Sequence, residues 1–258
     1  MTDDYRQRFG GMGRLYGSAG MERLCQAHVC VIGVGGVGSW SVEALVRSGV
    51  GRVTLVDMDD VCITNTNRQL PALSGTVGQP KVEVLRRRML EIHPACGVHA
   101  ITEFLTASNA ERLLSGPFDC VIDAVDRAAT KALIIARARA AGYRVITSGG
   151  AGGRCDATAV RSGDLCRSGG DNLLRGVRRI LRSEYGFPSG EGVPFGVTCV
   201  YSAEPQVFPW ADGTCRTTAE TGGSLKMDCA SGFGAATFVT GAFGFATAAE
   251  AVKQIAAG

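Results

Sequence analysis

The 258-residue sequence predicts an α/β protein built on one mostly parallel sheet with flanking helices. Short apolar segments, typical of buried strands, alternate along the chain with longer helical segments. This alternation indicates parallel strands joined by right-handed crossovers. A glycine-rich turn also follows the first apolar segment directly, at the edge where sheets of this kind bind ligands.

The expected elements begin at His28. Strands are expected over 28–33, 52–57, 97–101, 119–125 and 143–148, and helices over 39–48, 80–93 and 128–141. Residues 151–195 are polar and rich in glycine and arginine, which predicts a basic, mobile insertion. Residues 196–258 are expected to extend the sheet, with a strand over 196–203, a hairpin from 206–211 and 214–218, and a final helix.

The composition bears on three questions: a polyanionic partner, a zinc site and secretion. The net charge of +3 is too small for whole-molecule charge to imply a polyanionic partner. The ten cysteines include no C-x-x-C pair, which excludes a zinc site of the paired-cysteine type. The polar first residues contain no apolar stretch of the kind a secretory signal has, so we expect reduced thiols and a cytoplasmic protein.

Residues 229–249 form an uncharged stretch long enough to span a membrane. Their many glycines and threonines make the stretch only weakly apolar. Small residues at helical spacing suit close packing in a core or a subunit interface. A buried helix is therefore expected, with membrane association of this segment as the alternative.

A nucleotide site is predicted by the glycines of G-V-G-G-V-G, which stand between the first strand and the first helix. They are Gly33, Gly35, Gly36 and Gly38. Glycines let the backbone approach phosphate oxygens, and the helix N-terminus supplies free N–H groups. Asp57 ends the next strand, where an acid commonly holds ribose hydroxyls. These features alone would also suit NAD or FAD.

Three further residues favour ATP over a dinucleotide. Arg68 and Lys81 follow in the chain, and fixed cations stabilise the charge that develops on the α-phosphate and on departing pyrophosphate. Asp126, at the expected end of the strand that contains D-A-V-D, could hold Mg²⁺ on those phosphates. We therefore expect an enzyme that activates a carboxylate as an acyl-adenylate.

In this order the motifs resemble those of the ubiquitin-activating-enzyme-like superfamily, which includes bacterial activators of sulfur-carrier proteins. In that superfamily G-x-G-G-x-G, D-x-D, N-x-x-R-Q, a helix lysine and a strand-end aspartate bind MgATP. The matching residues are Gly33 to Gly38, Asp57, Asp59, Asn65, Arg68, Gln69, Lys81 and Asp126. The resemblance runs from about Arg8 onward and implies a single adenylation domain over 1–258, with 27–150 as its nucleotide-binding, Rossmann-like half.

The stretches RFGGMGRLYG, DMDDVCITNTNRQ, SGGAGG and MDCASGFGAAT resemble the subfamily of tRNA threonylcarbamoyladenosine dehydratases. Its members are homodimers that cyclise the N6-threonylcarbamoyl group of an adenosine beside the anticodon. The resemblance implies ATP and Mg²⁺ but no zinc, a tRNA substrate, and a partner linked to a cysteine desulfurase. Activation of a sulfur-carrier or ubiquitin-like protein is the first alternative, and an NAD-binding oxidoreductase is the second.

Two residues carry roles that only the resemblance suggests. The superfamily places an N-terminal arginine in the neighbouring subunit's active site; Arg14 is the candidate, and Arg8 aligns nearly as well. Related activators carry an acyl-accepting cysteine, for which Cys229 is the candidate. The alternative for Cys229 is a small packed thiol, since intramolecular cyclisation requires no thiol nucleophile.

An RNA-binding surface is predicted from the arginines of L-L-R-G-V-R-R-I-L-R. Arg175, Arg178, Arg179 and Arg182 recur at the spacing of one helix face, with no acid until Glu184. The alternative is an amphipathic surface helix whose arginines are only solvated.

Overall fold

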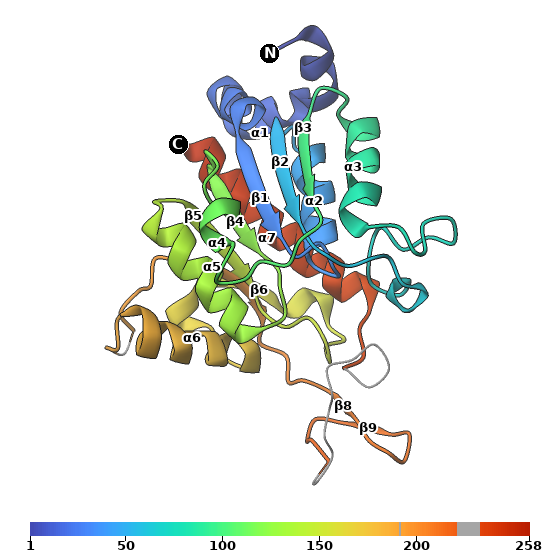
Figure 1. Cartoon of the computed structure of the whole chain (residues 1–258), viewed down its shortest axis with the longest axis vertical. Helices are drawn as coiled ribbons and strands as arrows, with labels where there is room; N and C mark the ends of the chain where they lie inside the picture. Colours follow the sequence, from blue (N-terminus) through green and yellow to red (C-terminus); the bar gives the residue numbers. More distant parts are fainter. Residues whose placement is uncertain (191, 221–232) are drawn as a thin grey trace.

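A seven-stranded sheet forms the centre of the computed structural model, which describes residues 1–190, 192–220 and 233–258. The strand order is β3-β2-β1-β4-β5-β7-β6, and every pairing is parallel except that of β6 with β7 (Figure 1). The strands are β1 (His28–Ile32), β2 (Arg52–Val56), β3 (Gly97–Ile101), β4 (Cys120–Asp123), β5 (Arg144–Ser148), β6 (Val160–Asp164) and β7 (Thr198–Ser202). The predicted α/β class with a mostly parallel sheet is confirmed.

The register of the central strands aligns their carboxyl ends. Ile32 of β1 lies opposite Val56 of β2 on one side and Asp123 of β4 on the other. All five residues of β1 are buried, as its continuous apolar run predicts. The segments that follow β1, β2 and β4 therefore meet at one edge of the sheet.

Helices cover both faces of the sheet. They are α1 (Asp3–Gln26), α2 (Gly38–Arg47), α3 (Lys81–Ile92), α4 (Ala110–Leu113), α5 (Ala128–Ala140), α6 (Asn172–Tyr185) and α7 (Thr237–Ala257). Leu24, Val42, Leu85 and Val252 bring α1, α2, α3 and α7 into one buried core on the first face. Leu113, Ile134 and Leu181 bring α4, α5 and α6 into a second core on the other.

Shorter elements complete the connections. They are the 3-10 turns η1 (Ile63–Asn65), η2 (Ala157–Ala159) and η3 (Leu165–Arg167), and the strands β8 (Phe208–Pro209) and β9 (Cys215–Arg216). β8 and β9 pair in antiparallel fashion and form the hairpin that the sequence predicts.

Close helix packing explains the small residues of α7. A Cβ on Gly244 would meet the Cβ of Trp40 at 2.5 Å and the carbonyl oxygen of Val37 at 2.7 Å, so only glycine lets α7 approach α2 this closely. The predicted buried helix is confirmed over 237–257, whereas residues 229–232 of the expected segment lie outside the described residues. Among the helices described, none combines the length and the apolarity that crossing a bilayer requires.

The sequence predicts no element before His28, but α1 fills this region. The hydroxyl of Thr2 caps the helix by accepting the N–H of Tyr5, and Asp3 and Asp4 favour its first turn. The Tyr5 hydroxyl donates to the carbonyl oxygen of Gly49 at 2.7 Å, just before β2. This contact places α1 at the amino end of the sheet. Its many glycines conceal the helical pattern, and Gly17, with φ of 74°, kinks it.

Residues 151–195 contain regular structure, including β6, which the sequence does not predict, and α6, which agrees with the helix expected for the arginine face. β6 adds an edge strand along β7, and α6 packs on α5. Asp164 ties this segment to the strand that follows, since its carboxylate accepts the N–H groups of Cys166, Phe195 and Gly196. The polar composition reflects an exposed edge strand and a half-exposed helix. The mobility and the domain boundaries stay predictions.

His28 should make the fold sensitive to acid. Its ring is buried beside Thr54, and burial together with Arg52 lowers the pKa of His28 to about 4. An unfolded histidine titrates near 6.5, so the unfolded state binds more protons between the two values. The contribution of His28 to the free energy of unfolding is fully present above about pH 6.5. It is lost as the pH drops towards 4, by roughly 1 to 2 kcal/mol after allowance for solvent screening.

Thermal unfolding between pH 7 and pH 4.5 measures this loss. The His28→Gln variant, which keeps a polar side chain beside Thr54, should show a shallower decline of Tm than the wild type. Carboxylates titrate in both proteins, so only the difference between the curves reports His28. Parallel curves would contradict the assignment.

Candidate functional site

The glycine turn between β1 and α2 is built by two close backbone approaches. A Cβ on Gly38 would stand 1.8 Å from the carbonyl oxygen of Gly33, so this position accepts no side chain. Gly33 itself has φ of 84° and lies against the backbone of Ala124 and Val125, at 3.0 Å from where its Cβ would be. The α2 helix starts at this turn without a side-chain cap, which leaves N–H groups for an anion.

Asp57 braces this turn from the end of β2. Its Oδ2 accepts the N–H of Val34 at 2.8 Å and its Oδ1 accepts the N–H of Asp59 at 2.9 Å. Burial raises the pKa of Asp57, against the effect of these two bonds and of Lys81. Lys81 is itself buried at the start of α3, and its Nζ lies 2.8 Å from Oδ2 of the half-exposed Asp59. The D-x-D motif thus joins the turn to the predicted lysine.

The N-x-x-R-Q motif lies in the connection from β2 to α3. The buried Asn65 shapes η1 by accepting the N–H of Cys62 at 3.0 Å. The Arg68 guanidinium donates to the carbonyl oxygen of Thr64 at 2.7 Å. The Arg68 carbonyl is anchored from two helices, by the indole N–H of Trp40 at 3.2 Å and the hydroxyl of Thr240 at 3.0 Å.

Arg68 and Gln69 reach the glycine turn. A Cβ on Gly36 would be 3.8 Å from Cγ of Arg68, and a Cβ on Gly35 would be 3.8 Å from Nε2 of Gln69. Oε1 of Gln69 is buried and has no hydrogen-bond partner among the described residues. A buried acceptor without a partner is costly, so this oxygen is suited to a donor on a ligand.

Asp126 lies on the same edge but not within a strand. β4 ends at Asp123, which is fully buried, and Asp126 follows in an exposed turn before α5. The sequence therefore places the strand end two residues too late, at Val125 instead of Asp123. The intervening Ala124 and Val125 are the residues that contact Gly33, so Asp126 directly follows the strip of backbone behind the glycine turn.

Within the described chain, no group of three or more histidine, cysteine, aspartate and glutamate side chains is arranged to hold a metal ion. Mg²⁺ in nucleotide sites needs only one or two carboxylates, because phosphates and water supply its other ligands. The exposed carboxylate of Asp126 fits that requirement.

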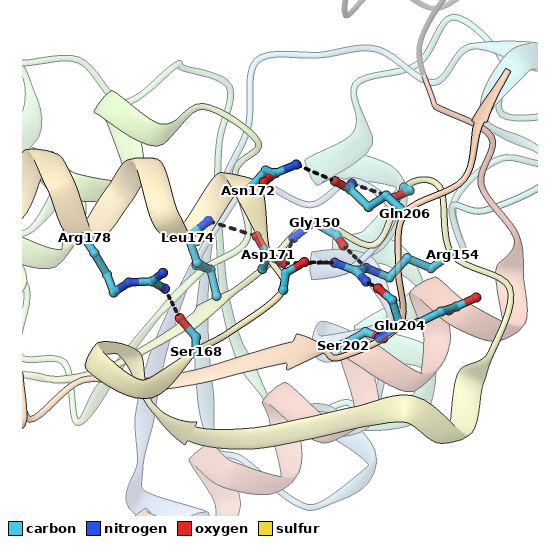
Figure 2. A network of polar contacts seen from close by, with 12 residues as sticks. Gly150, Arg154, Ser168, Asp171, Asn172, Leu174, Arg178, Ser202, Glu204 and Gln206 are labelled. Carbon is cyan, nitrogen blue, oxygen red and sulfur yellow. Dashed lines mark hydrogen bonds and ion pairs between the residues drawn. The ribbon is translucent and has the colours of Figure 1, made fainter. Parts of the chain in front are cut away.

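A second polar network joins this edge to α6, and the sequence does not reveal it (Figure 2). Arg154 and Asp171 are both almost fully buried, and a guanidinium nitrogen of Arg154 lies 3.7 Å from Oδ2 of Asp171. Asp171 accepts the N–H of Gly150 at 2.9 Å through Oδ2 and caps α6 by accepting the N–H of Leu174 at 2.9 Å through Oδ1. Arg154 donates to the carbonyl oxygens of Gly150 and Glu204. Of these contacts, only the helix cap has a local sequence signal, because aspartate is a typical residue at the position before a helix.

The four arginines of α6 share one face, as their spacing predicts. With Ser183 they line a hollow of about 460 Å³. Two of them also make contacts within the protein. Arg178 donates to the hydroxyl of Ser168, and Arg182 donates to the Pro188 carbonyl oxygen, with its guanidinium carbon 5.2 Å from the ring centre of Phe195. Arg175 and Arg179 are exposed and form no ion pair with any residue that the structure describes.

The two residues assigned by resemblance lie elsewhere. Arg14 is exposed and belongs to α1, the helix that lies at the amino end of the sheet, opposite the glycine turn (Figure 1). Cys229 lies outside the described residues. The structure thus gathers the glycines, Asp57, Asp59, Asn65, Arg68, Gln69, Lys81 and Asp126 at one edge, whereas α1, which carries Arg14, lies at the other end of the sheet.

This fold and site define a nucleotide-binding α/β protein with an anion cradle at the N-terminus of its first sheet helix. The ThiF family model matches residues 11–257, and the chain belongs to this family. It is 47% identical to the tRNA threonylcarbamoyladenosine dehydratase of Haemophilus influenzae over 253 residues, which covers 98% of this chain and 95% of the relative.

Two further comparisons place it within the family. The Escherichia coli tRNA N6-threonylcarbamoyladenosine dehydratase in complex with ATP superposes with a TM-score of 0.88 at 41% identity, over 99% of this chain and 96% of the other. A sulfur carrier protein adenylyltransferase of Thermus thermophilus is 41% identical, but over only 118 residues, or 46% of this chain and 43% of the relative.

Two substitutions in the glycine turn should differ in their effect on stability, because a Cβ fits at one position and not at the other. Gly38→Ala forces a Cβ against the Gly33 carbonyl, so it should lower the free energy of unfolding by about 2 kcal/mol or more. Gly35→Ala is the matched control, since its Cβ would make only an ordinary contact at 3.8 Å. Denaturant titration of both variants measures the difference. Equal stability of the two would contradict the geometry described for Gly38.

Proposed function

We propose that this chain uses ATP and Mg²⁺ to dehydrate N6-threonylcarbamoyladenosine in tRNA, closing a ring and releasing AMP and pyrophosphate. The observation that carries the proposal is the similarity, along nearly the whole chain, to a dehydratase solved with ATP. The residues at the carboxyl edge of the sheet fit that ligand. The glycine turn offers N–H groups to phosphates, and Arg68 and Lys81 supply positive charge beside it.

Ring closure proceeds in two steps that balance. An oxygen of the threonyl carboxylate attacks the α-phosphate, and pyrophosphate leaves. The urea-like nitrogen or carbonyl oxygen of the same side chain then attacks the activated carbonyl carbon, the bond to AMP breaks, and a proton is lost. The carboxylate oxygen departs with AMP, which accounts for the net loss of water. The attack is intramolecular, so its effective concentration is high and no acceptor protein is needed.

The described residues divide this work. Arg68 lies beside Gly36, where it can neutralise charge that develops on the α-phosphate. Lys81 is held at the same edge by Asp59 and can stabilise the departing pyrophosphate. Mg²⁺, held by Asp126, would neutralise further phosphate charge. Asp57 keeps the glycine turn in shape, and Gln69 offers its unpaired oxygen to the nucleotide.

The site assignment is tested by Arg68→Ala and Asp126→Asn. Each should reduce AMP formation from ATP and modified tRNA by about 100-fold or more, because each removes charge stabilisation from the transition state. Thermal unfolding should stay close to that of the wild type, since both side chains lie at the surface of the edge. Near-normal turnover in both variants would refute the assigned site.

The arginine face of α6 is the surface that we propose for tRNA. Arg175 and Arg179 are exposed cations without described ion-pair partners, and phosphate contacts need such side chains. Arg178 and Arg182 complete the face but also hold η3 and the segment after α6 in place. The face lies on the helix that Asp171 connects to the loop after β5.

Arg175→Ala/Arg179→Ala should weaken tRNA binding and lower the slope of log affinity against log salt by about 2, one for each lost phosphate contact. Filter binding at several salt concentrations measures the slope. Arg6→Ala/Arg47→Ala is the matched control, because it removes two arginines that pair with Asp3 and Glu43 elsewhere. Unchanged affinity in the α6 variant would leave this helix as ordinary surface.

A homodimer would explain Arg14. It belongs to α1, which lies at the amino end of the sheet, so we infer that it serves the nucleotide site of a second subunit rather than that of its own chain. We extend the proposal to a cytoplasmic homodimer in which Arg14 completes the neighbouring site. Cys229 has no step in this chemistry, and the partner linked to a cysteine desulfurase rests on the resemblance alone.

Activation of a sulfur-carrier protein is the second candidate, favoured by the adenylyltransferase similarity over 118 residues. It uses the same first step on a protein carboxylate. ATP–pyrophosphate exchange with modified tRNA or with a carrier protein as the substrate distinguishes the two functions. Exchange with the carrier alone would overturn the tRNA assignment.

A further inference from the structure

A fully buried ion pair supports the turn between β4 and α5. Nζ of Lys131 lies 3.1 Å from Oδ2 of Asp123, and both side chains are 0% exposed. Taking two charges out of water is costly, and apolar residues of similar volume often stabilise a core as well or better. Packing alone therefore does not account for a lysine at this position of α5.

The hydrogen bonds of Lys131 show what the pair controls. The ammonium also donates to the carbonyl oxygens of Asp123, at 3.3 Å, and Val125, at 3.0 Å. The Asp123 carboxylate accepts the hydroxyl of Thr147 at 2.7 Å and the N–H of Val125 at 3.3 Å. One ammonium and one carboxylate thus fix the backbone direction from Asp123 to Val125.

That short backbone segment has two neighbours in the nucleotide site. On one side, Ala124 donates its N–H to the carbonyl oxygen of Ile32 at 2.9 Å, and Ala124 and Val125 lie directly against Gly33. On the other side, the next residue is Asp126, whose side chain is exposed. The direction of the chain at Val125 therefore sets where the Asp126 carboxylate lies relative to the glycine turn.

We propose that Lys131 is a positioning residue for the nucleotide site: its buried ammonium holds the β4–α5 turn in the shape that presents the Asp126 carboxylate to phosphate-bound Mg²⁺. Lys131 touches neither nucleotide nor metal and acts through Asp126. This inference rests on the proposed function, because that proposal assigns Mg²⁺ to Asp126. An outer-shell residue of this kind typically changes metal affinity or activity by 10- to 100-fold when it is replaced.

A double-mutant cycle on nucleotide binding tests the proposal in the full chain. Calorimetry measures ATP affinity with Mg²⁺ and with EDTA for the wild type, Lys131→Met, Asp126→Asn and the double variant. Lys131→Met should lose about tenfold or more of the affinity that Mg²⁺ adds. In the Asp126→Asn background the same change should cost nothing further, because residues that act as one unit are not additive.

Two controls separate positioning from folding. Ile134→Ala removes a fully buried side chain from the same helix but no polar contact of the turn, so Tm should fall while the Mg²⁺ dependence stays unchanged. Lys131→Met leaves Asp123 without its cation, so the cycle is repeated with Asp123→Asn/Lys131→Met, which removes both charges. This variant should show the same loss of Mg²⁺ dependence.

Three results would overturn the proposal: additive effects of Lys131→Met and Asp126→Asn, an Mg²⁺ dependence that Lys131→Met leaves intact, or one that Asp126→Asn leaves intact. The proposed function fails by a different observation, namely wild-type protein that binds MgATP yet releases no AMP with modified tRNA. The cycle measures binding without tRNA, so the two failures are distinguishable.

Discussion

The nucleotide site depends on one close contact, between the glycine turn after β1 and the backbone after β4. Gly33 has no Cβ, so Ala124 and Val125 can lie against it, and Gly38 in turn lies against the Gly33 carbonyl. This contact sets the start of α2 and brings the segment leading to Asp126 beside the cradle. Asp57 supports the turn from the other side through Val34. A side chain at either glycine would push the glycine turn away from the backbone after β4.

Sequence patterns predict the parallel half of the molecule well, because each strand and helix there carries a local signal. The continuous apolar run of β1, the glycines and the charged helix α3 all indicate their structure without tertiary information. The failures have physical causes. The glycines of α1 obscure a helix that Thr2 caps and Tyr5 anchors, and β6 is an exposed edge strand without apolar alternation. Their stability comes from distant contacts.

The candidate site divides in the same way. Glycines, D-x-D and N-x-x-R-Q carry their spacing in the chain, and the structure gathers these residues at one edge. Lys131 and Arg154 carry no such signal, since a lysine in an alanine-rich helix and an arginine after glycines usually lie at the surface. Only the fold shows that both are buried beside aspartates. The strand before Asp126 is predicted to reach Val125 although it ends at Asp123, because an apolar pattern does not show where hydrogen bonding stops.

The double role of Asp171 has a thermodynamic consequence. One carboxylate oxygen caps α6 and the other holds Gly150 in the loop after β5, so the helix and the loop cannot shift independently without breaking a buried bond. A ligand that moves or rigidifies α6 would thereby change the energy of that loop. Linkage between two binding events is reciprocal. If a polynucleotide bound at α6 stabilises one conformation of the loop after β5, then a ligand that stabilises the same loop conformation raises the affinity for the polynucleotide by the same factor.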